Sequence, residues 1–329
     1  MATLSLCMIV RNEEKWLSQC LDAAKQFVDE IVIVDTGSSD RSVEIAQSYG
    51  AKVIELPWEH DFASAKNVAL DNASQDWILV LDADERILPD DFKRLKELLD
   101  TNNADAYKLE LRNYVKQAGP GYVSCIPSET TMQARSYRPI RMVRLFRNRQ
   151  EYRFENRVHE LVERTIESAG GRIGEASIPV HHYGILFSNV KHKTRYYAWL
   201  TFKQIEDDPT NVRALYLAGQ FMQEQGKTAS ALEYFHKAAS IDPAYKNVWF
   251  TIANVLVGQK RTEEAIKAYE QSLVHNPASP NAPQVINNLA VLYANAGRKQ
   301  DAKKLLELAM KQFPNDVAIR KNAERLVAA

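Results

Sequence analysis

The chain has few cysteines and no long apolar run. These two absences argue against a disulfide-rich protein and against a membrane-spanning one. Its 329 residues include only three cysteines, Cys7, Cys20 and Cys125. Their spacing is neither paired nor zinc-binding, so we expect no disulfide framework and a reducing compartment. No stretch approaches the about 20 apolar residues of a membrane-spanning helix, and the first residues do not resemble a signal peptide. We therefore expect a cytoplasmic protein with no transmembrane segment.

The chain has no excess of positive or negative charge. It also lacks two common nucleotide-binding motifs. Lysine plus arginine and aspartate plus glutamate number 42 each, so the formal net charge is zero. This balance argues against a nucleic-acid partner. Neither G-x-G-x-x-G nor G-x-x-x-x-G-K-[ST] occurs, which disfavours a dinucleotide-binding fold or a Walker loop. The remaining composition, 45% apolar and 26% charged, is that of a globular protein long enough for about two domains.

The first half of the chain alternates short apolar runs with segments of helical periodicity. Apolar runs too short for helices predict strands at residues 4–10, 31–34, 52–56 and 77–81. The alternation predicts an α/β fold, in which a Rossmann-like, mostly parallel sheet carries helices on both faces. After the first run, Asn12 is expected to cap a helix. Residues 106–115 and 140–146 have the pattern of later strands.

Polar residues follow the ends of these predicted strands. Asp35 closes the second strand, and Gly37 allows a tight turn directly after it. Ligands of open α/β sheets bind at the carboxyl ends of strands, where Asp35 can accept from a nucleobase N–H or a ribose hydroxyl. Asp82 and Asp84 suit a cation such as Mg²⁺ or Mn²⁺, because hard cations prefer carboxylate oxygens and bridge to phosphates. Ordinary strand-to-helix turns would explain each pattern equally well when it is taken alone.

Four motifs in a fixed order favour the ligand-binding interpretation. They are R-N-E-E at 11–14, D-T-G-S-S-D at 35–40, D-F-A-S-A-K-N at 61–67 and D-A-D-E at 82–85. Together they resemble the family 2 inverting glycosyltransferases of GT-A fold, over roughly residues 4–206. The resemblance is greatest to the subgroup of lipopolysaccharide-core glucosyltransferases and bacteriocin peptide S-glycosyltransferases. It implies an enzyme that transfers a sugar from a nucleoside-diphosphate sugar, with a UDP-sugar as the expected donor.

The resemblance assigns roles to single residues. It places Asp35 against the nucleoside and Asp82 at the ribose or a metal-bound water, and it makes Asp84 a ligand of Mn²⁺ or Mg²⁺. Lys66 stands where the family usually has arginine, and lysine loses the bidentate geometry of that side chain. The donor-binding residues that the resemblance implies are Arg11, Asn12, Asp35, Lys66, Asn67 and Asp82.

Two later motifs extend the resemblance. The V-H-E ending at Glu160 matches the subgroup and implies that Glu160 is the base that removes the acceptor's proton during an inverting attack. Asp61 and Glu85 are other carboxylates able to serve, and Glu160 could instead only orient the site. The H-x-G beginning at His182 implies that this histidine, rather than the one before it, joins Asp84 on the metal. Asp84 would thereby share in catalysis.

Residues 135–157, just before Glu160, contain eight arginines. They are Arg135, Arg138, Arg141, Arg144, Arg147, Arg149, Arg153 and Arg157. A strand over 140–146 would send Arg141 and Arg144 to opposite faces. A solvated basic face and contact with a phosphate or anionic acceptor both remain open. Nucleic-acid binding is disfavoured because few aromatic residues are interleaved.

The second half of the chain repeats with a period of 34 residues. Asp-Pro or Asn-Pro pairs recur at 208–209, 242–243 and 276–277, and small residues keep the same register. This is the tetratricopeptide period, which predicts three helix–turn–helix repeats over 210–314 and a capping helix at 316–326. Such repeats form a curved solenoid that can bind an extended peptide, serve only as structural support, or form a homodimer.

The sequence thus predicts three parts and one activity. The parts are a GT-A glycosyltransferase domain at 1–188, a linker helix at 189–208, and three repeats with a capping helix at 209–329. The expected activity is metal-dependent, inverting sugar transfer to a peptide or protein acceptor positioned by the repeats. A saccharide or lipid-linked saccharide acceptor is the main alternative, and an inactive nucleotide-binding scaffold is a second. A nucleotidyltransferase is disfavoured because no glycine-rich phosphate loop lies near the N-terminus.

Overall fold

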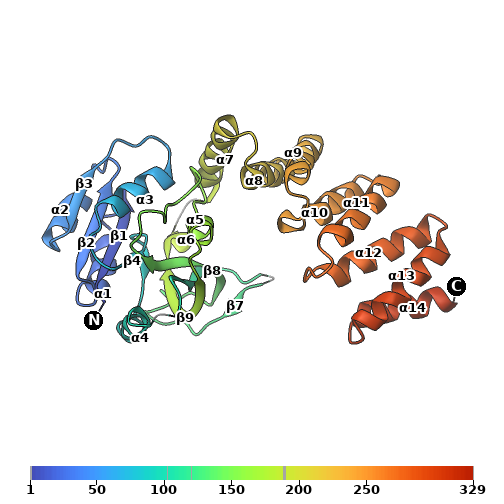
Figure 1. The fold of residues 1–329 in the computed structure, drawn as a ribbon, viewed down its shortest axis with the longest axis horizontal. Coiled ribbons are helices and arrows are strands. Elements are labelled where there is room, and N and C mark those ends of the chain that lie inside the picture. Colours follow the sequence, from blue (N-terminus) through green and yellow to red (C-terminus); the bar gives the residue numbers. More distant parts are fainter. Residues whose placement is uncertain (1, 102, 120, 188–189, 329) are drawn as a thin grey trace. The chain divides into compact units, whose positions relative to one another are not determined.

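The computed structural model describes residues 2–101, 103–119, 121–187 and 190–328 (Figure 1). The chain divides into two compact units, Met1–Leu200 and Thr201–Ala329. Within the described ranges, no helix combines the length and apolar content that a membrane-spanning helix requires.

The first unit is built on one mixed sheet. Its first four strands are parallel and lie in the order β3 (Lys52–Glu55), β2 (Glu30–Asp35), β1 (Leu4–Val10) and β4 (Trp77–Val80). The sheet continues from β4 with β8 (Ser136–Arg147), β6 (Ala106–Val115), β9 (Ile173–His182) and β5 (Glu85–Arg86), while β7 (Val123–Ser124) pairs with β8. Strand β8 runs antiparallel to both β4 and β6. The predicted α/β sheet of GT-A type is confirmed, with antiparallel strands added on one side.

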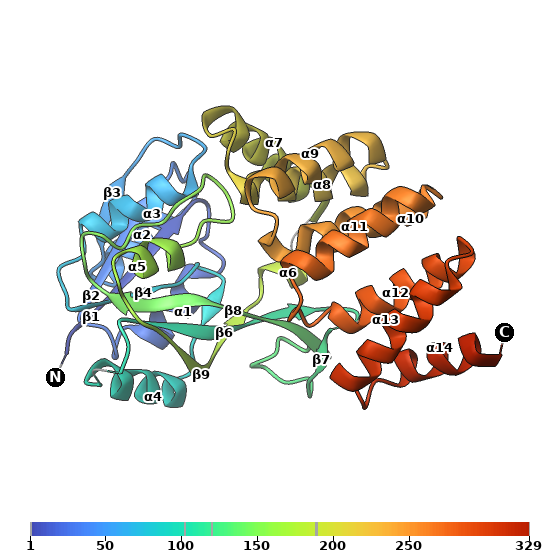
Figure 2. The same cartoon turned by 45° about the vertical axis from the view of Figure 1, so that its right-hand side comes forward.

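Helices cover both faces of this sheet (Figures 1 and 2). One face packs against α1 (Leu17–Ala24), α2 (Ser42–Ser48) and α4 (Pro89–Leu99), and the other against α3 (Phe62–Asp71) and α5 (Glu163–Ser168). In β4, Trp77 and Leu79 face the first set of helices, while Ile78 and Val80 face the second. Burial on both faces explains why this strand is a continuous apolar run. The carboxyl ends of β2 and β4 meet at one edge of the sheet.

The second unit consists of paired helices. The pairs are α8 (Val212–Glu224) with α9 (Thr228–Ile241), α10 (Val248–Gly258) with α11 (Thr262–His275), and α12 (Ala282–Asn295) with α13 (Lys299–Gln312). Helix α14 (Val317–Ala328) follows, and a short 3₁₀ turn, η1 (Tyr245–Asn247), precedes α10. Fully buried Ala231, Ala265 and Ala302 stand at equivalent places in the three second helices. The predicted all-α fold of this region is confirmed, with three helix pairs and one further helix.

A short helix and an 18-residue helix follow β9. They are α6 (Gly184–Phe187) and α7 (Val190–Asp207). The division between the compact units falls inside α7, after Leu200. The predicted linker helix began at residue 189, which lies outside the described residues, and the three-part domain boundaries stay predictions.

Candidate active site

Asp35, the last residue of β2, is buried at the carboxyl edge of the sheet. Its Oδ2 accepts hydrogen bonds from the backbone N–H of Gly37, at 3.0 Å, and of Ser38, at 2.9 Å. The backbone of Gly37 has φ +97°, a conformation that favours glycine. The other oxygen, Oδ1, is buried and has no hydrogen-bond partner among the described residues. A turn therefore fixes one oxygen of the carboxylate, while the second can still accept.

The loop after β1 is tied to the loop after β2. Asn12 has φ 57°, and its Oδ1 accepts from the backbone N–H of Ser39 at 2.8 Å. The Asn12 N–H in turn donates to Ser38 Oγ at 2.9 Å. The expected helix cap at Asn12 is therefore wrong, because its side chain binds a neighbouring loop and α1 begins only at Leu17. Arg11 beside it is exposed.

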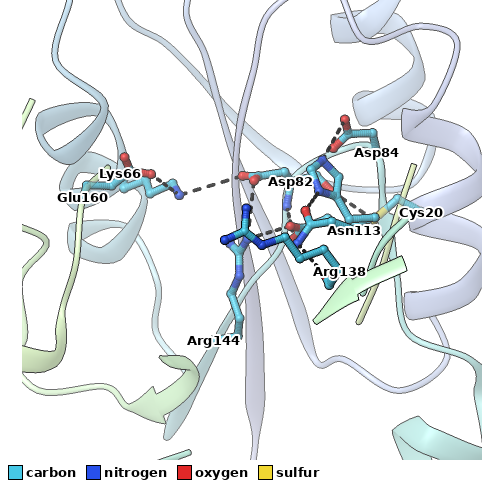
Figure 3. A network of polar contacts seen from close by, with 10 residues as sticks. Cys20, Lys66, Asp82, Asp84, Asn113, Arg138, Arg144 and Glu160 are labelled. Atoms are coloured by element: carbon cyan, nitrogen blue, oxygen red, sulfur yellow. Dashed lines mark hydrogen bonds and ion pairs between the residues drawn. The ribbon is translucent and has the colours of Figure 1, made fainter. Parts of the chain in front are cut away.

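Lys66, on α3, joins two carboxylates that are far apart in the sequence (Figure 3). Its buried Nζ lies 2.6 Å from Glu160 Oε1 and 3.8 Å from Asp82 Oδ1. Burial alone would lower the pKa of Lys66, but the charges of Glu160 and Asp82 outweigh that effect and raise it. Lys66 is therefore a fixed cation between the predicted base and the D-A-D motif.

Arg144, on β8, approaches Asp82 from the other side. Its Nη2 donates to Glu85 Oε1 at 2.5 Å and lies 3.5 Å from Asp82 Oδ2. Glu85 is fully buried, and its Oε2 accepts from the Asp82 N–H at 2.9 Å. Although burial opposes it, Lys66 and Arg144 hold the pKa of Asp82 well below its usual range. Asp82 is therefore an oriented, ionised carboxylate.

Asp84 and His182 face each other next to this network. His182 Nε2 lies 3.4 Å from Asp84 Oδ2, and its Nδ1 lies 2.6 Å from Asn113 Oδ1. Because an amide oxygen only accepts, His182 donates its Nδ1–H. In the neutral ring the lone pair of Nε2 then faces Asp84, and in the protonated ring an Nε2–H faces it. Although burial opposes it, the Asp84 carboxylate and its acidic neighbours raise the pKa of His182. A Cβ built on Gly184 would overlap Asp84 Oδ2, so glycine is needed beside this pair.

The Asp84–His182 pair suits a divalent cation in its chemistry. A carboxylate oxygen and an imidazole nitrogen oriented by a further hydrogen bond are the ligand types that Mn²⁺ accepts. In the part of the chain that the structure describes, no three His, Cys, Asp or Glu side chains gather as a complete ligand set. The residues therefore fit a cation that takes its remaining ligands from phosphate oxygens and water.

Comparison with protein families agrees with this arrangement. Residues 5–155 match the model described as glycosyl transferase family 2, and residues 222–282 and 284–311 match tetratricopeptide repeat models. The first unit carries a family 2 glycosyltransferase domain. The predicted combination of this family with tetratricopeptide repeats is confirmed.

Three curated proteins are similar to the chain over different lengths. A TPR repeat-containing protein of Synechococcus elongatus is 40% identical over 190 residues, 56% of this chain and 43% of that protein. An uncharacterized glycosyltransferase of Rickettsia typhi is 33% identical over 107 residues, 32% of this chain and 36% of that protein. The SPbeta prophage-derived glycosyltransferase SunS of Bacillus subtilis is 24% identical over 240 residues, 72% of this chain and 53% of that protein. The chain thus spans about half or less of the length of these relatives.

Within the glycosyltransferase domain, the two other candidate bases already have structural partners. Asp61 caps α3, its Oδ1 accepting from the Ser64 N–H at 2.9 Å. Glu85 is paired with Arg144 and has no exposed surface. Glu160 keeps 15% of its side chain exposed. Asp61 is 25% exposed, but of these three carboxylates it is Glu160 whose partner, Lys66, also approaches Asp82, and its role as the base stays a prediction.

Asn67, a predicted site residue, and His181, which was not one, have partners that the motifs did not suggest. Asn67 donates to the Phe154 carbonyl at 3.0 Å and accepts from the Phe154 N–H at 2.8 Å. Asn67 thereby anchors the segment that leads to Glu160, and its donor contact stays a prediction, as does that of Arg11. His181, the histidine before His182, is buried with its Nδ1 2.7 Å from the Tyr114 hydroxyl. Of the two histidines, it is His182 that meets Asp84.

The R-x-x-R-L-F-R run at 141–147 resembles the same subgroup, which favours a structural or donor-site role for the run. It did not separate Arg144 from its neighbours, and no sequence pattern singled out Asn113. The predicted opposite faces of Arg141 and Arg144 are confirmed, since Arg141 is exposed and bound to Glu175 at 2.6 Å while Arg144 is buried. The period of a strand shows that these two arginines diverge but not which one turns inward. Asn113 stood on a predicted strand, but nothing in its sequence context pointed to His182.

Proposed function

We propose that the chain is an inverting glycosyltransferase that moves a sugar from a nucleoside-diphosphate sugar to a peptide or protein. One observation carries the proposal: Lys66 lies between Glu160 and Asp82. The predicted base and the predicted donor-binding carboxylate come from distant segments, yet they share one buried cation. A purely structural role would not require a half-exposed Asp82 in that position.

The donor would lie along the carboxyl edge of the sheet. Asp35 Oδ1, which has no hydrogen-bond partner among the described residues, would accept from an N–H of the nucleobase. Asp82, held by Arg144, would accept from a ribose hydroxyl. Lys66 and Arg144 are cations that lie beside Asp82 and would face a diphosphate placed there. A UDP-sugar fits because uracil offers a ring N–H to an acceptor oxygen.

The transfer would be a single displacement. The acceptor's oxygen or sulfur attacks the anomeric carbon, the bond from that carbon to the diphosphate oxygen breaks, and Glu160 takes the acceptor's proton. Lys66 would move from Glu160 toward the diphosphate as the donor binds, which frees the carboxylate to act as a base. Loss of the diphosphate from the opposite face of the carbon gives inversion.

The charges of the site support a requirement for a divalent cation. Three carboxylates, Asp82, Asp84 and Glu160, lie there with Glu85, whose pKa is raised to about 7 by burial, against two permanent cations, Lys66 and Arg144. A diphosphate adds further negative charge as it leaves. Mn²⁺ or Mg²⁺ held by Asp84 and His182 would offset that charge.

The donor side can be tested without knowing the acceptor. A panel of UDP- and GDP-sugars is incubated with the chain and Mn²⁺, and release of UDP or GDP is measured. We expect slow hydrolysis of one donor, which is lost with chelator and strongly reduced in Asp84→Asn. Hydrolysis that continues unchanged with chelator and in Asp84→Asn would remove the metal assignment.

The catalytic step is tested by Glu160→Gln once a donor is known. The variant keeps the shape of the side chain but cannot take a proton, so transfer should fall about 100-fold or more. Donor binding, measured by calorimetry, should remain. Glu167→Gln, a change at an exposed carboxylate on α5, is the control. Transfer retained in Glu160→Gln would assign the base elsewhere.

The peptide acceptor rests on two supports of different kinds. The motifs resemble a subgroup that includes peptide S-glycosyltransferases, and three tetratricopeptide repeats offer a surface suited to an extended chain. A saccharide acceptor is the competing outcome. Transfer to a short saccharide at a rate that substitutions on the repeats do not change would favour it.

A further inference from the structure

Six aromatic rings of the first unit pack together next to the segment that carries the predicted base. The loop before α3 and the first residue of that helix supply three of them, and α7 supplies the other three. The six residues are Trp58, His60, Phe62, Tyr196, Tyr197 and Trp199, and we call them the aromatic wall. Each is at least partly exposed, and the apolar cores on the two faces of the sheet are built from other residues. The aromatic wall is therefore a surface feature that the packing of the sheet does not explain.

One end of the aromatic wall meets the segment that ends in Glu160. The ring centroid of Tyr197 lies 5.7 Å from that of His159, the residue before Glu160, and 6.0 Å from that of Phe62. The Phe62 N–H donates to the Arg157 carbonyl at 2.9 Å, which ties the loop before α3 to the same segment. Burial and then the negative charges of the nearby site carboxylates raise the pKa of Tyr197 to about 12. This end of the wall therefore lies beside the catalytic carboxylates.

The other end of the wall presents a tryptophan to solvent. Trp199 is 42% exposed, and its ring stacks on that of Tyr196 with centroids 5.9 Å apart. The Tyr196 hydroxyl accepts from the Trp58 indole N–H at 2.7 Å and lies 2.7 Å from His60 Nδ1. His60 has φ 60°, a left-handed backbone that is uncommon outside glycine, and its ring lies 4.9 Å from that of Trp199. Hydrogen bonds and ring contacts therefore fix the exposed tryptophan before any ligand binds.

The chemistry of the outer end favours an apolar ligand over a saccharide or an ion. Three polar atoms there, Trp58 Nε1, Tyr196 Oη and His60 Nδ1, already bond to one another. A saccharide loses water from many hydroxyls when it binds, and each loss has to be matched by a new hydrogen bond. None of the six side chains carries a permanent charge, so an ionic group gains little. An aromatic ring needs only ring surface, since aromatic pairs attract at centroid separations of about 4.5–7 Å.

We propose that the aromatic wall is a subsite for an aromatic side chain of the acceptor polypeptide, close in sequence to the residue that receives the sugar. Ring centroids from His159 through Tyr197 and Tyr196 to Trp199 follow one another at 5.7, 6.3 and 5.9 Å. An extended chain covers about 3.3 Å per residue, so the aromatic residue should stand within roughly six residues of the acceptor residue. The inference rests on the proposed transfer to a peptide or protein, and it names a feature by which the first unit selects the acceptor residue.

The test offers the full chain, with the donor found by nucleotide release, a pool of peptides with a central Ser, Thr or Cys between random residues. Mass spectrometry sequences the modified peptides, and the frequency of Trp, Tyr and Phe at each position is compared with the input. We expect aromatic enrichment near the acceptor residue with the native chain and with Trp199→Phe, but not with Trp199→Ser. The control, Val274→Ser, changes an exposed apolar residue of the second unit and should keep the enrichment. Unchanged enrichment in Trp199→Ser would overturn the subsite.

A ratio of two rates makes the result independent of the fraction of a variant that folds. One modified peptide is synthesised with its aromatic residue and with alanine in that position, and kcat/KM is measured for both. The native chain should prefer the aromatic peptide about tenfold or more, because alanine leaves the ring surface of the wall uncovered. In Trp199→Ser this preference should fall about threefold or more, and Trp199→Phe should retain most of it. A structural role for Trp199 lowers both rates and leaves the ratio unchanged, which would overturn the subsite.

Other outcomes separate the failure of this subsite from the failure of the proposed function. If the native chain modifies peptides without any aromatic preference, the subsite fails and transfer to a polypeptide stands. If the native chain hydrolyses a donor but modifies no peptide, transfer to a polypeptide fails, and the subsite fails with it. Methyl glycosides are offered in the same assay. Transfer to a methyl glycoside that Trp199→Ser weakens, with no transfer to peptides, would assign the aromatic wall to a saccharide and overturn the proposal.

Discussion

The positive charge of Arg144 compensates the two carboxylates next to it, Glu85 and Asp82. It is 4% exposed and bonds to Glu85, which has no exposed surface. Removal of one partner of such a pair leaves the other charge buried and uncompensated, at a cost of about 3–5 kcal/mol. We expect Arg144→Met to lower the free energy of unfolding of the first unit by that amount.

A double-mutant cycle separates this cause from lost packing. In Arg144→Met/Glu85→Gln both charges are gone. The double variant should therefore lose clearly less free energy of unfolding than the sum of the losses in the two single variants. Urea titrations of the four chains, followed by tryptophan fluorescence, measure it. Additive losses would show that Arg144 and Glu85 do not depend on each other.

His181 makes stability depend on pH in a definite direction. Burial lowers its pKa from about 6.5 to about 4, so it is neutral in the native state at pH values where the unfolded chain binds a proton. Stability should be full above pH 6.5 and fall as the pH drops toward 4. The total loss is roughly 2–3 kcal/mol.

The matched variant for this prediction is His181→Gln, which keeps an acceptor for the Tyr114 hydroxyl and cannot titrate. Its free energy of unfolding should fall less than that of the native chain between pH 6.5 and 4. Parallel pH curves for the two chains would contradict the prediction, because other titrating groups contribute equally to both.

Single site residues could be predicted only where a motif marked them. Asp82, Asp84, Glu160 and His182 stood in ordered motifs, and the structure brings them together. Arg144 was one of eight arginines, and only the sheet decides which face of β8 is buried. Their assigned roles in donor and metal binding stay predictions.

Two glycines in the paired helices test how closely those helices pack. In α8, a Cβ on Gly219 would lie 2.6 Å from the ring of Phe235, which is fully buried in α9. Gly219→Ala should therefore destabilise the second unit by about 1–3 kcal/mol through overpacking. In α10, a Cβ on Gly258 would meet no atom within 4 Å.

Gly258→Ala is thus the matched control, the same change in a helix with open space. It should raise stability by about 0.5–1 kcal/mol, because alanine loses less backbone freedom on folding than glycine. Thermal unfolding followed by helical circular dichroism measures both variants. Destabilisation of equal size in the two would mean that helix propensity, not contact with Phe235, sets the cost.

Strands and helices could be predicted where periodicity was complete. Residues 106–115 were predicted as a strand by alternation, and β6 has those bounds. The expected strand at 140–146 is longer, because β8 runs from Ser136 through Pro139. Pro139 is tolerated where β8 pairs with β6 on one side and neither β4 nor β7 pairs on the other. The cap expected at Asn12 failed because its partner, Ser39, lies in another loop.

The chain as a unit joins a donor site to a set of repeats, and the two can be tested apart. A chain ending at residue 208 keeps all of α7 and the family 2 domain. If the repeats position the acceptor, this shortened chain should hydrolyse donor at a near-native rate but lose most transfer to a peptide. Circular dichroism confirms that it folds. Equal loss of both activities would make the repeats a structural support.

Division into two compact units could be predicted from the sequence, because the alternating and the 34-residue patterns differ in period. The place of division could not be predicted in the same way. Helix α7 continues through it with helical periodicity on both sides, so no break in pattern marks Leu200.

The partnerless oxygen of Asp35 also bears on which bases the donor site can distinguish. A buried acceptor without a donor costs about 1–3 kcal/mol, and a ligand that supplies an N–H returns that free energy. Uracil and guanine carry a ring N–H on the hydrogen-bonding edge, whereas cytosine carries a lone pair there. UDP and GDP should therefore raise the unfolding midpoint more than CDP at equal concentration. That ranking, measured by heating alone, would show whether the site prefers uracil or guanine to cytosine before the sugar or acceptor is known.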